Sequence, residues 1–286
     1  MPVCLAVAAA LLTLILAADR VEANPESRRD GRITFIVGES GDTGPSPRLI
    51  VMDADGANIR VRLGYVYHAS LSPDGRLLAY DPAGSRDTRV IAADGPLRDR
   101  LLVRNGRSAD WSPTGAAVAF VRGSDIWVKN LRSGAERRVV RNGEAPDWSP
   151  DAKKLAFVRG RSPTDYYNGA VWVVDLVSKR THRLIRRAGN ERWSPNGHWI
   201  AFERELAPRN RVSGASYPVY IYVARADGTK QVRLAKGESP AWSPDGRELA
   251  FTDGRRIVRV RPDGGSRRVV YAPRYFLACR DLDWAR

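Results

Sequence analysis

The chain has 286 residues, and its 47 Lys and Arg residues against 32 Asp and Glu residues give a formal net charge of +15 at pH 7. This length suits one domain with a sizeable core, and two cysteines are too few for a disulfide-stapled scaffold. The charge favours an anionic partner without naming one.

The first 23 residues have the features of an export signal. Val3–Ala18 is an apolar run too short for a comfortable membrane span, and Val21–Ala23 offers small residues at the cleavage positions. No basic residue precedes the run, against the usual charge bias, so an uncleaved membrane anchor is the alternative. We expect residues 1–23 to be a signal peptide and residues 24–32 a linker. The mature protein would then be periplasmic, at the cell surface or secreted, with Cys279 as its single cysteine.

A motif of the form W-S-P-D-G-x-x-h-A-F recurs through the rest of the chain. Its copies are Leu71–Tyr80, Trp111–Phe120, Trp148–Phe157, Trp193–Phe202 and Trp242–Phe251, with a truncated copy at Asp283–Arg286. They repeat about every forty residues, which is the period of a β-propeller with one four-stranded blade per repeat.

Each part of the motif has a backbone role. In Ser243–Gly246, Pro fixes φ, Asp bonds its own backbone and Gly accepts a positive φ, which predicts a tight turn between the first two strands of a blade. The preceding tryptophan suits packing between blades far better than ligand stacking. Ile33–Val37 has second-strand character with no motif before it, so we expect Leu282–Ala285 to supply its first strand and close the ring. The predicted blades are 33–63 with 281–286, then 68–103, 109–140, 146–186, 191–234 and 240–271.

The repeat resembles that of TolB-type propellers. The hairpin motif, an apolar strand, a D-G turn and a basic last strand follow one another from Ile33 to Arg286. The resemblance implies an all-β, six-bladed propeller domain of four-stranded blades over residues 33–286. A TolB protein carries a further α/β domain ahead of its propeller, for which this chain has no room. The resemblance does not fix the function, because this fold serves scaffolds, receptors and enzymes alike.

The predicted propeller has two unlike faces. The S-P-D-G and D-G turns lie on one, which we call the turn face, and the loops between second and third strands lie on the other, which we call the loop face. Three insertions fall on the loop face, at Gly38–Pro47, Arg159–Gly169 and Glu203–Pro218. Variable loops on a fixed scaffold often carry binding sites, and Tyr and Arg are frequent in recognition surfaces. The candidates are Tyr166, Tyr167, Arg209, Arg211 and Tyr217; the alternative is that these insertions are merely solvated.

A second group of candidate binding residues surrounds the predicted channel mouth: His68, Asp110, Asp147, Arg192, Glu238 and Asp283. The three aspartates each precede a motif tryptophan, and three carboxylates that converge on one axis could hold Ca²⁺. Ser70, Arg192 and Ala241 interrupt that ring. We therefore favour a structural role, in which each carboxylate bonds backbone or an arginine of its own blade, and we expect no cofactor.

Signals for catalysis are weak. The sequence contains no G-x-S-x-G elbow, H-E-x-x-H pair or phosphate-cradling loop. His68, His182 and His198 are predicted on the channel face, an outer strand and a hairpin turn, too far apart to share a metal. We expect no enzymatic activity. The alternative is a small envelope lyase or lactonase that acts on an anionic saccharide at the channel mouth through carboxylates and arginines.

Arginines recur on the predicted fourth strands and form a basic belt around the rim. They are Arg60, Arg62, Arg98, Arg100, Arg137, Arg138, Arg180, Arg183, Arg233, Arg267 and Arg268. We favour the interpretation that this belt protects exposed edge strands. The alternative is that it contacts an anionic polysaccharide or lipid surface. Nucleic acid is disfavoured, because no motif with stacking aromatics occurs. The sequence thus predicts a monomeric, exported, non-catalytic binding or scaffold module of the cell envelope, with a protein as the preferred partner.

Overall fold

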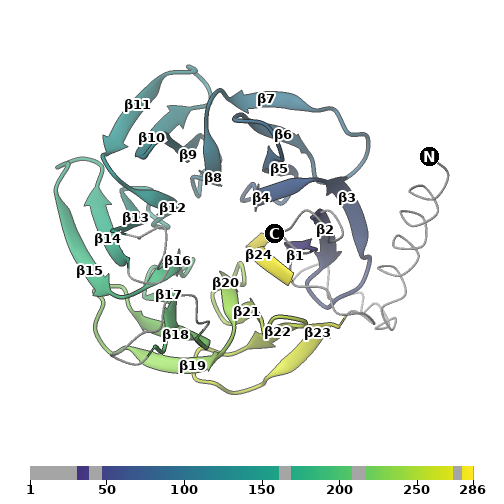
Figure 1. Cartoon of the computed structure of the whole chain (residues 1–286), viewed down its shortest axis with the longest axis vertical. Coiled ribbons are helices and arrows are strands. Elements are labelled where there is room, and N and C mark those ends of the chain that lie inside the picture. The colour runs from purple at the N-terminus through teal and green to yellow at the C-terminus, as the bar shows by residue number, and fades with distance from the viewer. Residues whose placement is uncertain (1–30, 39–46, 161–168, 208–216, 273–278, 286) are drawn as a thin grey trace.

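The computed structural model describes residues 31–38, 47–160, 169–207, 217–272 and 279–285, which form six four-stranded antiparallel sheets arranged in a ring (Figure 1). This confirms the predicted six-bladed propeller. The described residues contain no helix, and so none that is long and apolar enough to cross a membrane.

The strands of each blade follow one another from the channel outwards. Blade 1 is β24 (Cys279–Ala285), β1 (Arg32–Val37), β2 (Arg48–Asp53) and β3 (Arg60–Gly64); blade 2 is β4 (Val66–Leu71), β5 (Leu77–Pro82), β6 (Thr88–Ala92) and β7 (Arg100–Val103). Blade 3 is β8 (Arg107–Trp111), β9 (Ala117–Arg122), β10 (Asp125–Asn130) and β11 (Glu136–Val140); blade 4 is β12 (Glu144–Trp148), β13 (Lys154–Arg159), β14 (Ala170–Asp175) and β15 (Thr181–Arg186). Blade 5 is β16 (Gly189–Trp193), β17 (Trp199–Glu205), β18 (Val219–Arg225) and β19 (Val232–Lys236); blade 6 is β20 (Glu238–Trp242), β21 (Leu249–Thr252), β22 (Ile257–Val260) and β23 (Arg268–Tyr271).

The motif turn is held by its serine as well as by proline and glycine. The Ser243 hydroxyl donates to Asp245 (2.7 Å) and accepts from the backbone N–H of Glu248 (2.9 Å), while Gly246 has a φ of 70°. Ser72 and Ser149 make the same pair of hydrogen bonds. Because one side chain closes the turn from both ends, every repeat starts its second strand in the same register.

The core consists of the interfaces between blades. Phe120, Phe157, Phe202 and Phe251, which end the motif copies, are fully buried, and the motif tryptophans Trp111, Trp148, Trp242 and Trp284 are at most 8% exposed. In one interface, Val128 of blade 3 packs with Trp148 and Phe157 of blade 4. The predicted packing role of the tryptophans is therefore confirmed for these four residues.

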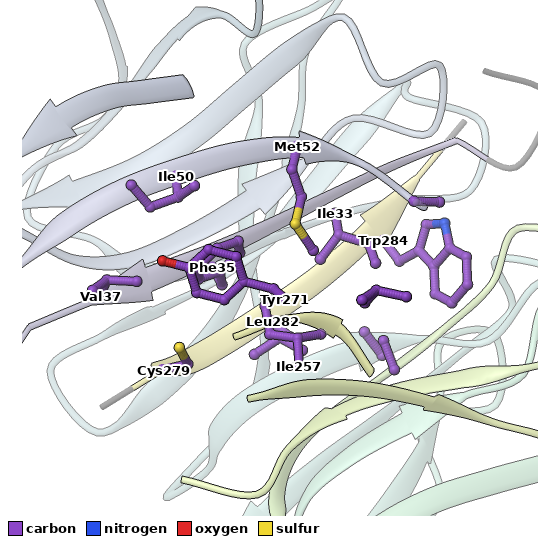
Figure 2. Close-up of a cluster of buried hydrophobic side chains, with 14 residues drawn as sticks. Ile33, Phe35, Val37, Ile50, Met52, Ile257, Tyr271, Cys279, Leu282 and Trp284 are labelled. Atoms are coloured by element: carbon purple, nitrogen blue, oxygen red, sulfur yellow. The ribbon is translucent and has the colours of Figure 1, made fainter. Parts of the chain in front are cut away.

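The two ends of the chain share blade 1, as expected. β24 pairs with β1 in antiparallel register, with Ile33 opposite Trp284. Figure 2 shows the cluster that results, in which Phe35 and Trp284 of blade 1 lie with Ile257 and Tyr271 of blade 6. This cluster therefore joins β24 both to β1 of its own blade and to the neighbouring blade 6.

Two of the expected loop insertions begin later than predicted. Arg159 ends β13 and Arg204 lies within β17, so neither belongs to a loop. The Arg159 guanidinium lies over Phe157 and Trp172, at 5.1 and 5.0 Å from the ring centroids, and donates to the Arg141 carbonyl (2.9 Å). Arg204 makes the corresponding contacts with Phe202, Tyr222 and the Arg186 carbonyl. Each arginine holds the link that leads into its own blade. These contacts explain why β13 and β17 continue beyond the predicted ends of the strands.

Part of the rim belt also joins blades. Arg60 of β3 pairs with Asp94 of blade 2 at 2.9 Å, and Arg62 donates to the Ala92 and Gly95 carbonyls of the same turn. Arg137, Arg267 and most other belt arginines are exposed.

Candidate ligand channel

The six innermost strands line the channel, and five of them are irregular at the same place; in β4 the shift comes earlier, between Val66 and His68. Pairing with the second strand shifts just before the residue that precedes the motif tryptophan, for example between Glu144 and Asp147. The residue three positions before that tryptophan has a positive φ in five blades: Ser108, Ala145, Asn190, Ser239 and Asp281. A bulge there re-aims the side chains that follow it. Only a weak sequence signal marks it, since Asn and Asp tolerate this conformation better than most residues.

The three predicted ring aspartates join neighbouring blades. Asp110 accepts from the backbone N–H of Trp148 (3.1 Å), Asp147 from that of Trp193 (2.6 Å) and Asp283 from that of Leu71 (2.6 Å). Each partner therefore lies in the next blade, whereas the sequence suggested a partner within the same blade. The bulge explains the difference, because it changes the direction of each carboxylate so that it reaches the backbone of the next blade.

An ion pair links blades 1 and 2 at the loop side of this ring. His68 Nδ1 lies 3.0 Å from Asp281, and the other oxygen of Asp281 accepts from the Ala69 N–H (2.8 Å). Burial lowers the pKa of His68, but the charge and hydrogen bond of Asp281 outweigh burial and raise this pKa to about 9. Burial acts to raise the pKa of Asp281, yet the imidazolium holds it below its ordinary value. The pair is thus charged at neutral pH.

Arg192 is the cation nearest to the ring aspartates. Burial opposes its charge, but Asp147, Asp110 and Asp283 together raise the pKa of its guanidinium. One arginine does not balance three carboxylates. Burial and the repulsion between neighbouring carboxylates raise the pKa of Asp147 well above its ordinary value, and burial with the charge of Asp283 raises that of Asp110 to about 7. The ring therefore retains protons at a pH at which ordinary aspartates are ionised.

Two cavities meet at the ring. The loop-face cavity has a volume of about 240 Å³ and is lined by residues that include Tyr67, His68, Arg107, Glu144 and Arg192. The turn-face cavity has a volume of about 440 Å³ and is lined mainly by tryptophans and prolines of the motif turns. Asp110, Asp147 and Asp283 line both cavities.

Five of the predicted binding residues line this channel, two described ones do not, and four lie outside the described residues. His68, Asp110, Asp147, Arg192 and Asp283 line the loop-face cavity. Glu238 begins β20 with an exposed side chain outside the lining, and Tyr217 is half-buried just before β18. Tyr166, Tyr167, Arg209 and Arg211 lie outside the described residues. Among the residues that the structure describes, no three His, Cys, Asp or Glu side chains are placed to share a metal ion, so the Ca²⁺ alternative gains no support.

Two exposed tyrosines at the link between blades 1 and 2 were missed by the sequence analysis. Tyr65 and Tyr67 are 64% and 60% exposed, and Tyr67 lines the cavity. Tyr65 has a φ of 59°, which is rare for a bulky residue, and its backbone bonds Pro47 of blade 1 and Ala83 of blade 2. The sequence signal that could have identified this site is the occurrence of two tyrosines within three residues at a link between blades.

Comparison with known proteins supports the fold. Residues 103–147 match the model of the dipeptidyl peptidase IV (DPP IV) N-terminal region. No curated protein sequence matches the chain.

Solved structures resemble it over most of its length. TolB from Acinetobacter baumannii is 20% identical with a TM-score of 0.69, over 89% of this chain and 66% of that one, just under two thirds. A protein of Agrobacterium tumefaciens assigned as TolB is 17% identical with a TM-score of 0.62, over 90% of this chain and 99% of that one. An oligogalacturonate lyase in complex with manganese is 17% identical with a TM-score of 0.52, over 84% and 73% of the two chains. The chain therefore has the six-bladed β-propeller fold of the TolB structures.

Proposed function

We propose that the chain is an exported, non-catalytic binding module that recognises a cell-envelope partner through its loop face. The observation that carries the proposal is the loop-face mouth, where the exposed Tyr67 lines a polar cavity. Tyrosine and arginine are the residues that most often anchor protein partners. Arg107 and Glu144, 3.6 Å apart at the same mouth, add a polar rim. A protein partner fits this mixture best.

The channel chemistry favours binding over turnover. Asp110 and Asp147 each use one carboxylate oxygen to join two blades, and Asp281 uses both of its oxygens. His68 is held as an imidazolium, which cannot act as a general base. The carboxylates that join blades are thus not free for proton transfer, so a lyase or lactonase at this mouth is the weaker candidate.

The binding test compares two surfaces that differ in position and in charge. We expect Tyr67→Ala with Arg107→Ala to abolish capture of partners from envelope extracts at both low and high salt. Reversal to Glu of Arg137, Arg138, Arg267 and Arg268 should remove only a salt-sensitive part. Both sets are expected to leave the Tm near that of the parent, because surface substitutions usually change stability by about ±0.5 kcal/mol each. Loss of capture in the rim set alone would assign the function to the basic belt.

Export is tested by the N-terminus of the mature protein. If the small residues at Val21–Ala23 mark cleavage, the secreted product begins at Asn24. Terminal sequencing of the protein from fractionated cells decides this. A membrane-bound product that begins at Met1 or Pro2 would instead establish an anchor.

A further inference from the structure

The turn-face cavity has a wall and a floor of opposite character. Its wall is built from the repeated motif turns of the blades and includes Trp111, Trp148 and Trp193 with Pro113, Pro150 and Pro195. Its floor is the ring of Asp110, Asp147 and Asp283. We call this cavity the funnel. Its volume of about 440 Å³ admits several side chains, but not a folded domain.

The funnel is acidic within a basic protein. The three floor aspartates are the only ionisable residues that line it in the described part of the chain, although the whole chain carries a net charge of +15. Arg192 and the His68–Asp281 pair approach these aspartates from the loop-face cavity, and Glu191 adds a further carboxylate near Asp147. Among the described residues, the funnel lining thus contains three carboxyl groups and no cationic side chain.

Two floor aspartates also have an oxygen to spare. Asp147 is only 8% exposed, and one of its oxygens bonds the Trp193 N–H. Within the described residues, no hydrogen bond reaches the second oxygen of Asp147 or of Asp110. Asp283 differs, because its second oxygen accepts from the Trp284 N–H. Because the Asp147 side chain is buried, its ionised form is costly unless a cation arrives.

We propose that the funnel binds the guanidinium or ammonium head of an Arg or Lys side chain presented by a protein partner. The cation meets Asp110 and Asp147 at the floor, and its aliphatic stem lies along the proline and tryptophan wall. The face of an aromatic ring attracts a cation, and a guanidinium supplies several donors to two carboxylates at once. A divalent metal fits less well, because the described lining offers no carboxylate beyond the floor and no three side chains there are placed to share a metal ion. The site lies on the face opposite to the loop-face mouth and does not depend on its function.

The floor also couples binding to protons. Burial, with repulsion between carboxylates, raises the pKa values of Asp110 and Asp147, so the empty floor retains protons near neutral pH. An arriving cation favours the ionised carboxylates and displaces those protons. Affinity for the cation should therefore increase as pH rises from 6 to 8.

The test uses two capped tripeptides, acetyl-Ala-Arg-Ala-amide and its citrulline analogue, titrated by calorimetry into the full chain. Citrulline has nearly the same shape as arginine but no charge. We expect the arginine peptide to bind at pH 8 at least about tenfold more tightly than the citrulline peptide, and more weakly at pH 6. Titration at pH 7 in buffers of different ionisation enthalpy should show proton release.

Matched variants locate the site. Asp110→Asn with Asp147→Asn keeps the hydrogen bonds to Trp148 and Trp193 while it removes the floor charge, and it should weaken the arginine peptide at least about tenfold. Glu144→Gln, at the opposite mouth, should leave the affinity unchanged. Equal binding of both peptides, unchanged affinity in the floor variant with a parent-like Tm, or a loss in Glu144→Gln equal to that in the floor variant would each overturn the proposal.

Discussion

A chain that ends at Cys279 should lose cooperative folding. The deletion removes most of β24, the inner strand of blade 1, and with it Leu282 and Trp284, which are 1% and 6% exposed. Truncation of a buried Trp to Ala typically costs ~3–5 kcal/mol, against a total stability on the order of 5–15 kcal/mol. The deletion also exposes the edge of β1 and removes the ring over which Arg259 of blade 6 lies, 4.5 Å from its centroid. Near-UV circular dichroism and urea unfolding measure the loss.

Two further variants separate closure from simple shortening. A chain that lacks only Arg286 keeps all of β24 and should melt like the parent. Trp284→Ala alone should unfold at lower urea than the parent but still in one transition, because the strand pairing with β1 remains. If the chain that ends at Cys279 melts at the parent temperature, β24 is not what closes the ring.

Most of the fold could be read from the repeated hairpin, because its signals are local. Pro, Asp and Gly in Ser243–Gly246 determine the turn without help from the rest of the chain, and a Trp and a Phe at fixed offsets mark the two strands. Closure of the ring was predicted because the first repeat lacks its first strand and one additional strand remains at the end of the chain. These inferences came from the spacing and number of the repeats and required no knowledge of contacts between blades.

The site was less readable, because its geometry depends on contacts between blades. Asp147 was correctly placed at the channel, but its bond to Trp193 crosses to blade 5 and depends on a bulge whose residue, Ala145, carries no signal for positive φ. Arg159 and Arg204 resembled loop residues, because their partners are aromatic rings on the neighbouring strand of the sheet and carbonyls of a preceding link. The funnel arises only when the wall residues of separate repeats converge.

The pH dependence of stability tests the buried charges directly. We expect the Tm to be highest near pH 4 and to fall steadily towards pH 9. His68 contributes fully below its unfolded pKa of 6.5, and that contribution is lost as pH rises through its folded pKa of about 9. A shift of this size corresponds to roughly 3 kcal/mol, or on the order of 5–10 °C in Tm for a chain of this length.

The ring aspartates act in the same direction over a lower range. Their folded pKa values lie above the ordinary 3.8, so the unfolded chain ionises first and stability falls as pH rises from about 4 towards 7. Asp281 and the turn aspartates Asp74, Asp151 and Asp245 have lowered pKa values and act in the opposite sense, with stability lost only as pH falls below 3.8. The maximum therefore lies between the two groups.

Two variants show which side chains cause the fall in Tm at higher pH. Asp147→Asn keeps an acceptor for the Trp193 N–H and removes a buried charge, so it should raise the Tm at pH 8 and leave it almost unchanged at pH 4. His68→Gln should remove the part of the fall between pH 6.5 and 9, because Asp281 then loses its titrating partner. Thermal melts at intervals of one pH unit measure both effects. A parent Tm that stays constant from pH 5 to 9, or variants whose curves run parallel to that of the parent, would show that these side chains do not titrate as the channel geometry requires.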